Sequence, residues 1–283
     1  MMQNKLFIKR IVFLVIALLF CVSTVATAEF IEYSMNSSVV NIQSSNVQDF
    51  VQQDANQTVL NSNESKKEVL YVNTPNFTNS SVKFMYYIPQ TLVNSKKSFP
   101  VIVYVPGLDG DGETSVNQEF YDLADSYGFG ILTPTFKFNM DDFNQERSYQ
   151  YPKAWAGDAL IDMLNMAKSR GLNYSKLYLV GFSAGAQFSS RFSLLKPELV
   201  EACAIMASGA RVIPRQTNNV KYFVGIGTSD TEYRKENALL FTNNARKRGI
   251  IVEYHEYPIG HDMNEQEIND VVEFFKKVKN SNY

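Results

Sequence analysis

A serine flanked by small residues is the first feature of this sequence that could do chemistry. Residues 181–185 read Gly-Phe-Ser-Ala-Gly and lie between an apolar, strand-like run and a helix-like run. A serine raised on a tight strand-to-helix turn needs small residues two positions away on each side, because the chain folds back there and a Cβ would collide. Gly181 and Gly185 meet this requirement, so Ser183 is the candidate nucleophile.

The candidate base is one of only two histidines in the chain. A serine hydroxyl is a poor nucleophile at neutral pH unless a base takes its proton and an acid orients that base. His255 falls inside a predicted strand, residues 251–257, where we expect it to be packed or solvated. His261 follows in a loop before the last predicted helix, and we predict it as the base. The alternative is that His261 is an ordinary surface histidine, which would leave the serine without a base.

The candidate acid is Asp230, which directly follows a predicted strand, residues 222–226 with a short Gly-rich extension. In a sheet whose strands alternate with helices along the chain, the expected order of the three residues is serine, acid, histidine. Asp262 is a poor candidate because it is adjacent to His261, and neighbouring side chains diverge. The stretch after the preceding strand, residues 207–210, contains no carboxylate. The alternative role for Asp230 is the N-cap of the helix that follows it.

Backbone N–H groups are the expected donors to the oxyanion of a tetrahedral intermediate. One should come from Ala184, next to the nucleophile, where the N-terminus of a helix adds a favourable dipole. The second should come from the loop at residues 106–112, with Leu108 as the first choice and Asp109 as the second.

The same loop raises a competing interpretation as a calcium site, because it contains Asp109, Asp111 and Glu113. An EF-hand loop requires a glutamate at position 12, and the residue in that position counted from Asp109 is Phe120. A surface turn rich in Gly and Asp is the commoner explanation. We therefore expect no metal and no other cofactor.

Aromatic residues are frequent in the long loop at residues 135–152 and just beyond it. Tyr151 and Trp155 are the candidates for a substrate-binding wall, and packing beneath the loop is the equally weighted alternative. Between the strands predicted at residues 202–206 and 222–226 there are too few residues for a helical cap domain, so we expect an open site.

Strand-like and helix-like patterns alternate through the rest of the chain, which predicts an α/β fold. The expected architecture is a doubly wound, mostly parallel sheet with helices on both faces and no large cap domain. The strands are expected at residues 69–72, 82–88, 100–105, 129–133, 177–180, 202–206, 222–226 and 251–257, the first two forming an antiparallel pair. The helices are expected at residues 115–127, 153–170, 184–195, 233–248 and 265–279. Ligands of such sheets bind beyond the carboxyl ends of the strands, where all the candidates above lie.

The N-terminus has the pattern of an export signal. Lys5, Lys9 and Arg10 precede a short apolar run and small residues that end at Ala28. We predict cleavage after Ala28 and a secreted or cell-surface protein without stable membrane insertion. The alternative is an uncleaved signal anchor.

The predicted organisation is a signal peptide at residues 1–28, a polar flexible segment at 29–66 and a catalytic domain at 67–283. The formal net charge is −2, and loss of the signal would make the chain more acidic. No basic stripe suggests a nucleic-acid partner. Only Cys203 would remain after cleavage, so no disulfide within the chain is expected.

Four of these segments together resemble the α/β-hydrolase superfamily: residues 101–110, 181–185, 227–230 and 260–261. Within it, the chain is similar to the secreted polyhydroxybutyrate-depolymerase and feruloyl-esterase-like group, with dienelactone hydrolases as relatives. One departure is Pro106-Gly107, where the family usually has His-Gly.

This resemblance implies a secreted serine esterase that forms an acyl-enzyme. The open site and the predicted export favour an ester that is polymeric or carbohydrate-linked, such as an acylated polysaccharide or a polyester. The alternatives are a hydrolase-fold binding protein without catalysis and a serine exopeptidase.

Overall fold

An eight-stranded sheet organises the protein in a computed structural model, which describes residues 64–74, 80–108, 110–137 and 147–280. These residues belong to one compact unit, Val59–Tyr283. The strand order is β1-β2-β4-β3-β5-β6-β7-β8. The strands are β1 (Lys66–Thr74), β2 (Ser80–Ile88), β3 (Phe99–Val105), β4 (Gly130–Pro134), β5 (Tyr174–Phe182), β6 (Val200–Met206), β7 (Lys221–Gly227) and β8 (Val252–Tyr257).

The predicted antiparallel opening and parallel remainder are both confirmed. β1 pairs antiparallel with β2, and β2 pairs antiparallel with β4. Every later pair is parallel, from β3 with β4 to β7 with β8. Because β5 to β8 run in the same direction, their carboxyl ends lie at one edge of the sheet.

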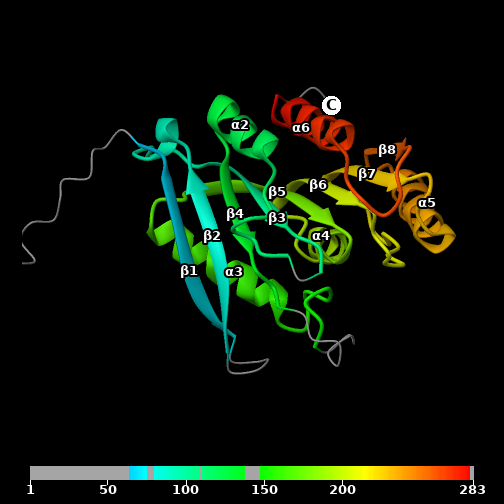
Figure 1. The fold of residues 1–283 in the computed structure, drawn as a ribbon, viewed down its shortest axis with the longest axis horizontal. Coiled ribbons are helices and arrows are strands. Elements are labelled where there is room, and N and C mark those ends of the chain that lie inside the picture. The colour runs from blue at the N-terminus through cyan, green and yellow to red at the C-terminus, as the bar shows by residue number, and fades with distance from the viewer. Residues whose placement is uncertain (1–63, 75–79, 109, 138–146, 281–283) are drawn as a thin grey trace, which may run out of the picture. The chain divides into compact units, whose positions relative to one another are not determined.

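Helices cover both faces of the sheet (Figure 1). On one face, α2 (Gln118–Tyr127) and α6 (Glu265–Lys279) pack over one buried cluster. On the other face, α3 (Ala156–Ser169), α4 (Ala184–Leu195) and α5 (Glu232–Arg246) pack over a second. The alternation of side chains along a strand supplies both clusters. In β3, for example, Val103 belongs to one cluster and Ile102 to the other.

The predicted elements all occur, with differences mainly at their ends. α4 and α6 have the predicted bounds, whereas α3 begins at Ala156 instead of residue 153. The short 3₁₀ helix η1 (Gln90–Leu92) was not predicted. The predicted signal peptide lies outside the described residues, and the domain boundary at residue 67 stays a prediction. Within the described part of the chain, no helix is both long and apolar enough to span a membrane.

Candidate active site

Ser183 occupies a sharp turn between β5 and α4. Its φ of 53° and ψ of −112° are rare for a residue with a side chain, and such strain is stored chiefly at functional sites. A Cβ on Gly181 would overlap the backbone of Gly185, and one on Gly185 would overlap the carbonyl oxygens of Val105 and Pro106. The two glycines therefore let β5, the start of α4 and the end of β3 meet closely enough to lift Ser183.

His261 reaches the serine from the loop between β8 and α6. Its Nε2 lies 2.9 Å from Ser183 Oγ. The loop is fixed against the end of β7, because the N–H of Ser229 donates to the carbonyl of Ile259 at 2.9 Å. The bare Cα of Gly227 permits this approach, since a Cβ there would overlap the carbonyl oxygens of Ile259 and Gly260.

Asp230 completes the hydrogen-bonded chain from the turn after β7. Its Oδ2 lies 2.9 Å from His261 Nδ1, and its Oδ1 accepts the Thr231 N–H at 2.6 Å. The carboxylate is fully buried. The N-cap of α5 is Thr231, so the alternative role for Asp230 as an N-cap is not adopted.

The electrostatic surroundings keep Asp230 ionised. Burial by itself would raise the pKa of this carboxyl group. The hydrogen bonds from His261 and Thr231, together with the charges on His261 and Arg234, outweigh burial and lower the pKa below its ordinary value. A negative Asp230 can hold the imidazole with its proton on Nδ1, which leaves Nε2 free to accept the Ser183 hydroxyl proton.

Two further side chains support this arrangement and were not predicted. Phe182 stacks on the imidazole of His261, with ring centroids 5.2 Å apart. Arg234, four residues after Asp230 on α5, places Nη1 3.4 Å from Asp230 Oδ1. The contact of Arg234 could have been predicted from its spacing of four residues from Asp230. The stacking of Phe182 could not, because it depends on the loop of His261, which is distant in sequence.

The structure describes two of the three predicted oxyanion donors, Ala184 and Leu108. Ala184 is the first residue of α4 and is buried, and its N–H is one of the four that have no acceptor within the helix. The loop after β3 touches the same turn, because Gly107 lies against the Phe182 side chain. Leu108 in this loop is 43% exposed, and Asp109 lies outside the described residues. The roles of all three stay predictions.

Comparison with solved structures identifies the fold. The chain is similar to a ferulic acid esterase (TM-score 0.60, 14% identity, 76% of this chain and 98% of that chain). It is also similar to an S-formylglutathione hydrolase from Agrobacterium tumefaciens (0.58, 14%, 76% and 95%). A third similar structure is a fluorophosphonate-binding serine hydrolase from Staphylococcus aureus (0.57, 12%, 76% and 99%). The chain has the α/β-hydrolase fold. No protein-family model and no curated protein matches the sequence.

The two histidines of the chain have different surroundings. His255 lies on β8, stacks on Phe223 with ring centroids 4.8 Å apart and has Nε2 3.3 Å from Glu253 Oε2. This is the packed, partly solvated strand position that the sequence predicted. Only His261 lies at the carboxyl edge of the sheet beside Ser183.

The two predicted aromatic substrate contacts differ in their placement. Trp155 is 4% exposed, packs edge to face on Phe136 and donates its indole N–H to Arg147 O at 2.6 Å. Its ring therefore packs beneath the loop, and the expectation that it forms an open wall is not supported. Tyr151 is partly exposed and stacks against the guanidinium of Arg191.

Two acidic residues of the loop after β3, Asp111 and Glu113, form ion pairs. Lys83 Nζ lies 2.5 Å from Asp111 and 3.5 Å from Glu113. In the described ranges, no three His, Cys, Asp or Glu side chains gather as a metal site would require. The ion pairs with Lys83 occupy the carboxylates of Asp111 and Glu113.

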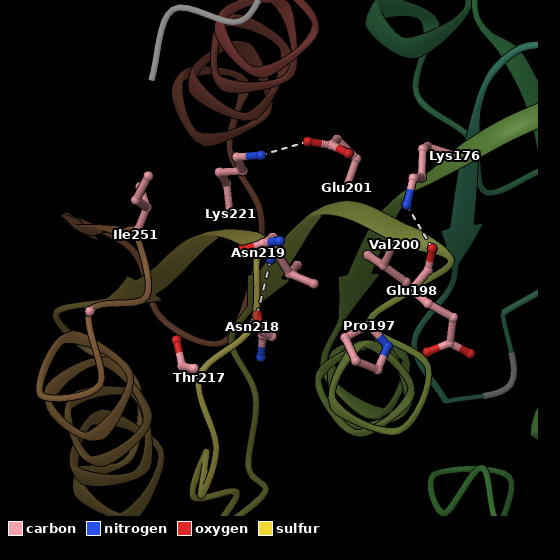
Figure 2. A pocket seen from close by; sticks show the side chains of 12 residues that line it. Lys176, Pro197, Glu198, Val200, Glu201, Thr217, Asn218, Asn219, Lys221 and Ile251 are labelled. Atoms are coloured by element: carbon pink, nitrogen blue, oxygen red, sulfur yellow. Dashed lines mark hydrogen bonds and ion pairs between the residues drawn. The ribbon is translucent and has the colours of Figure 1, made fainter.

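A separate hollow lies at the opposite edge of the sheet. It has a volume of about 620 Å³ and includes the first residues of β6 and β7. Figure 2 shows that three of its charged side chains are engaged: Lys221 contacts Glu201 at 2.5 Å, and Lys176 donates to the Glu198 carbonyl at 2.6 Å. This hollow is at the amino ends of the strands, away from Ser183.

Proposed function

We propose that the protein is a serine hydrolase of carboxylic esters. Ser183 attacks the ester carbonyl while His261 takes the hydroxyl proton, and the same imidazole then gives that proton to the departing alcohol. The resulting acyl group on Ser183 is removed by water, which His261 activates in the same way. Asp230 holds the imidazole and stabilises its positive charge during both steps.

Stabilisation of the tetrahedral oxyanion is assigned to backbone donors. The N–H of Ala184 has the N-terminal dipole of α4 behind it, which favours negative charge at that point. The second donor is assigned to the loop after β3, at Leu108 or Asp109. A site of this kind favours the transition state because its donors are already in place before charge develops.

One observation carries this proposal: Ser183, His261 and Asp230 form a continuous chain with two successive contacts of 2.9 Å. These residues come from three different connections of the sheet, so their convergence is a property of the fold as a whole. A chance surface histidine would not be expected to contact both a strained serine and a buried carboxylate.

Labelling with a fluorophosphonate tests the assignment directly. The reagent should attach to the wild-type protein in a 1:1 ratio, and intact-mass analysis should find no adduct on the Ser183→Ala variant. Peptide mapping should locate the adduct on Ser183. A label on another residue, or equal labelling of both proteins, would contradict the proposal.

The proposal also includes export of the protein and an extracellular ester as its substrate. The support for export is the N-terminal pattern that ends at Ala28. The support for a bulky substrate is the short connection between β6 and β7, which carries no helix in the described structure. We infer an acyl ester on a polysaccharide or a polyester as the substrate. Hydrolysis rates on acetyl, feruloyl and hydroxybutyrate esters test this class, and inactivity on all three would reject it.

A further inference from the structure

One face of α4 leads away from the nucleophile along the protein surface. Most residues of this helix are buried, and the four that are not are Gln187, Arg191, Leu194 and Leu195. Residues four apart lie above one another on a helix. Ser183, Gln187 and Arg191 therefore form one row that begins at the catalytic hydroxyl and continues into the two leucines.

A hollow of about 550 Å³ lies at the far end of this row. The described residues that form its walls combine apolar side chains with two cations and include no carboxylate; they are Tyr151, Pro152, Lys153, Arg191, Leu194, Leu195 and Val212. Such a site suits a ligand with an apolar body and a negative group. The excess of positive charge is local, since the whole chain is slightly acidic.

Arg191 is held in place at the edge of this hollow. Its Nη1 donates to the carbonyl of Gln150 at 2.8 Å and has a longer contact, 3.4 Å, with the carbonyl of Gln187. The guanidinium lies over the ring of Tyr151, 4.0 Å from its centroid. Fixing a guanidinium in this way reduces the entropy that a bound anion must overcome.

The remaining donors of Arg191 are not used by the part of the chain that the structure describes. Among the described residues, Nε and Nη2 have no hydrogen-bond acceptor, and no carboxylate forms an ion pair with this arginine. Both atoms are accessible to solvent. In this they differ from Arg234 Nε, which is buried without a hydrogen-bond partner. A guanidinium that is positioned but lacks a carboxylate partner is prepared to form a bidentate contact with one from outside.

The spacing along α4 sets the reach of this contact. One helical turn of about 5.4 Å separates Ser183 from the level of Gln187, and the Arg191 side chain reaches back toward that level. The guanidinium is therefore on the order of 10 Å from the nucleophile.

We propose, on the basis of the esterase function above, that Arg191 with Lys153 forms a carboxylate-recognition subsite. The preferred substrates are then esters that carry a carboxylate on the order of 10 Å from the ester carbonyl. Both substrate types inferred above can supply this group, because a polyester fragment ends in a carboxylate and an acidic polysaccharide carries uronates.

Paired esters that differ only in charge test the subsite. One panel contains 4-nitrophenyl half-esters of linear dicarboxylic acids and the 4-nitrophenyl esters of monocarboxylic acids of equal chain length. A second panel places the carboxylate in the alcohol part and is followed by acid release. In at least one panel, kcat/KM for the charged ester should exceed that for the neutral partner by about ten- to a hundredfold, mainly through KM.

Variants assign the preference to the arginine. Arg191→Gln should reduce the charged-to-neutral ratio toward one, and Arg191→Lys should retain part of it. Arg248→Gln is the matched control, because Arg248 also donates Nη1 to the carbonyl four residues earlier but lies just after the end of α5, outside the lining. A ratio near one in the wild type, or a ratio that survives in Arg191→Gln, would overturn the proposal.

A binding measurement separates this proposal from the esterase assignment. Calorimetry on Ser183→Ala compares dicarboxylic acid monomethyl esters with the corresponding dimethyl esters, so no turnover is needed. Tighter binding of the charged ester, abolished by adding Arg191→Gln, would support the subsite even if hydrolysis failed. Equal affinities would reject the subsite, whereas turnover of neutral esters would leave the esterase function standing.

Discussion

At the scale of single residues, the catalytic hypothesis depends on how three side chains are held. The strained φ of Ser183, the buried carboxylate of Asp230 and the loop that carries His261 bring their polar atoms into one hydrogen-bonded chain. Each of these features removes freedom from the site before substrate arrives. Catalytic power in such sites comes largely from this preorganisation.

Removing the nucleophile or the base should abolish turnover. Ser183→Ala or His261→Ala is expected to lower kcat by roughly 10⁶-fold, because members of such a unit act together. Asp230→Asn should lower kcat by about 10⁴-fold by favouring the wrong imidazole tautomer. His255→Ala, which removes the other histidine, should retain activity in the same steady-state assay. A tenfold or smaller loss in Ser183→Ala would show that another residue is the nucleophile.

The stacking of Phe182 on His261 gives a smaller expected effect. An aromatic pair of this kind contributes about 0.5–1.5 kcal/mol, so Phe182→Ala should lower kcat by roughly two- to tenfold through looser positioning of the imidazole. Phe182→Tyr retains a ring at 5.2 Å from the imidazole and should restore most of the rate. Thermal unfolding of both variants separates this effect from global destabilisation. Unchanged kcat in folded Phe182→Ala would contradict the positioning role.

The sequence pattern pointed to Ser183, Asp230 and His261 but not to the side chains of Phe182 and Arg234 that contact them, for a physical reason. Gly181, Ser183 and Gly185 follow one another along the chain, so their steric requirement is visible in the local pattern. The contact between Phe182 and His261 joins residues that are far apart in the sequence, and no local rule reports it. Trp155 illustrates the reverse error, because an aromatic near a site looks the same in sequence whether it lines a surface or fills a core.

At the scale of elements, the α6 N-terminus shows how packing and charge combine next to the histidine loop. Asn264 caps this helix by accepting the N–H of Glu267 at 2.8 Å. The Glu267 side chain is 1% exposed, and its Oε1 has no hydrogen-bond partner. It lies directly on Gly225 of β7, where a Cβ would overlap the carboxyl oxygen. The glycine in this strand therefore accommodates a buried acid.

Ionisation of Glu267 should make stability fall with rising pH. Burial raises the pKa of this carboxyl group to about 8, and the nearby charges of Asp262 and Asp270 add to the shift. The unfolded chain releases the proton near pH 4.5 and the folded protein only near pH 8. The contribution of this group is therefore most favourable below pH 4.5, declines through that window and levels off above pH 8.

Glu267→Gln tests this pH dependence because it keeps the shape and cannot ionise. The free energy of unfolding is measured with denaturant for the variant and the wild type. The variant's value minus the wild-type value should increase by up to about 1.4 kcal/mol per pH unit as the pH rises from 4.5 to 8. Glu265→Gln, on the exposed face of the same turn, should follow the wild-type profile. A constant difference between Glu267→Gln and wild type over this range would show that Glu267 has an ordinary pKa.

The predicted bounds of helices were right where the hydrophobic periodicity was strong. The order of the strands in the sheet could not be predicted in this way. The bounds of α4 and α6 follow from helical spacing and from clear stop signals, whereas η1 is too short to leave a periodic pattern. The position of β4 between β2 and β3 could not be read from the chain, because strand order is set by how helices cross over the sheet. Such crossings depend on tertiary packing and not on local propensity.

At the scale of the whole molecule, the two faces of the sheet are sealed by residues from nearly the whole described chain. β1 contributes Val72, which is 3% exposed, and Leu70, which packs against the same cluster. It also covers β2, whose Phe84 and Tyr86 are fully buried. Among the described residues, β1 is thus part of the core, and the start of the folding unit near residue 67 stays a prediction.

A pair of truncations tests where the folding unit begins. A chain that starts at Glu64 keeps β1 and should retain the melting temperature and the esterase activity of the full chain. A chain that starts at Ser80 loses β1, whose buried Val72 stabilises the fold by about 1.5–3 kcal/mol and whose partly buried Leu70 contributes less. It also leaves β2 as an unpaired sheet edge, which promotes aggregation. We expect a melting temperature at least several degrees lower, measured by circular dichroism, and loss of soluble protein. A Glu64 chain that failed to fold would show that residues 1–63 belong to the unit, and the predicted boundary would then be wrong.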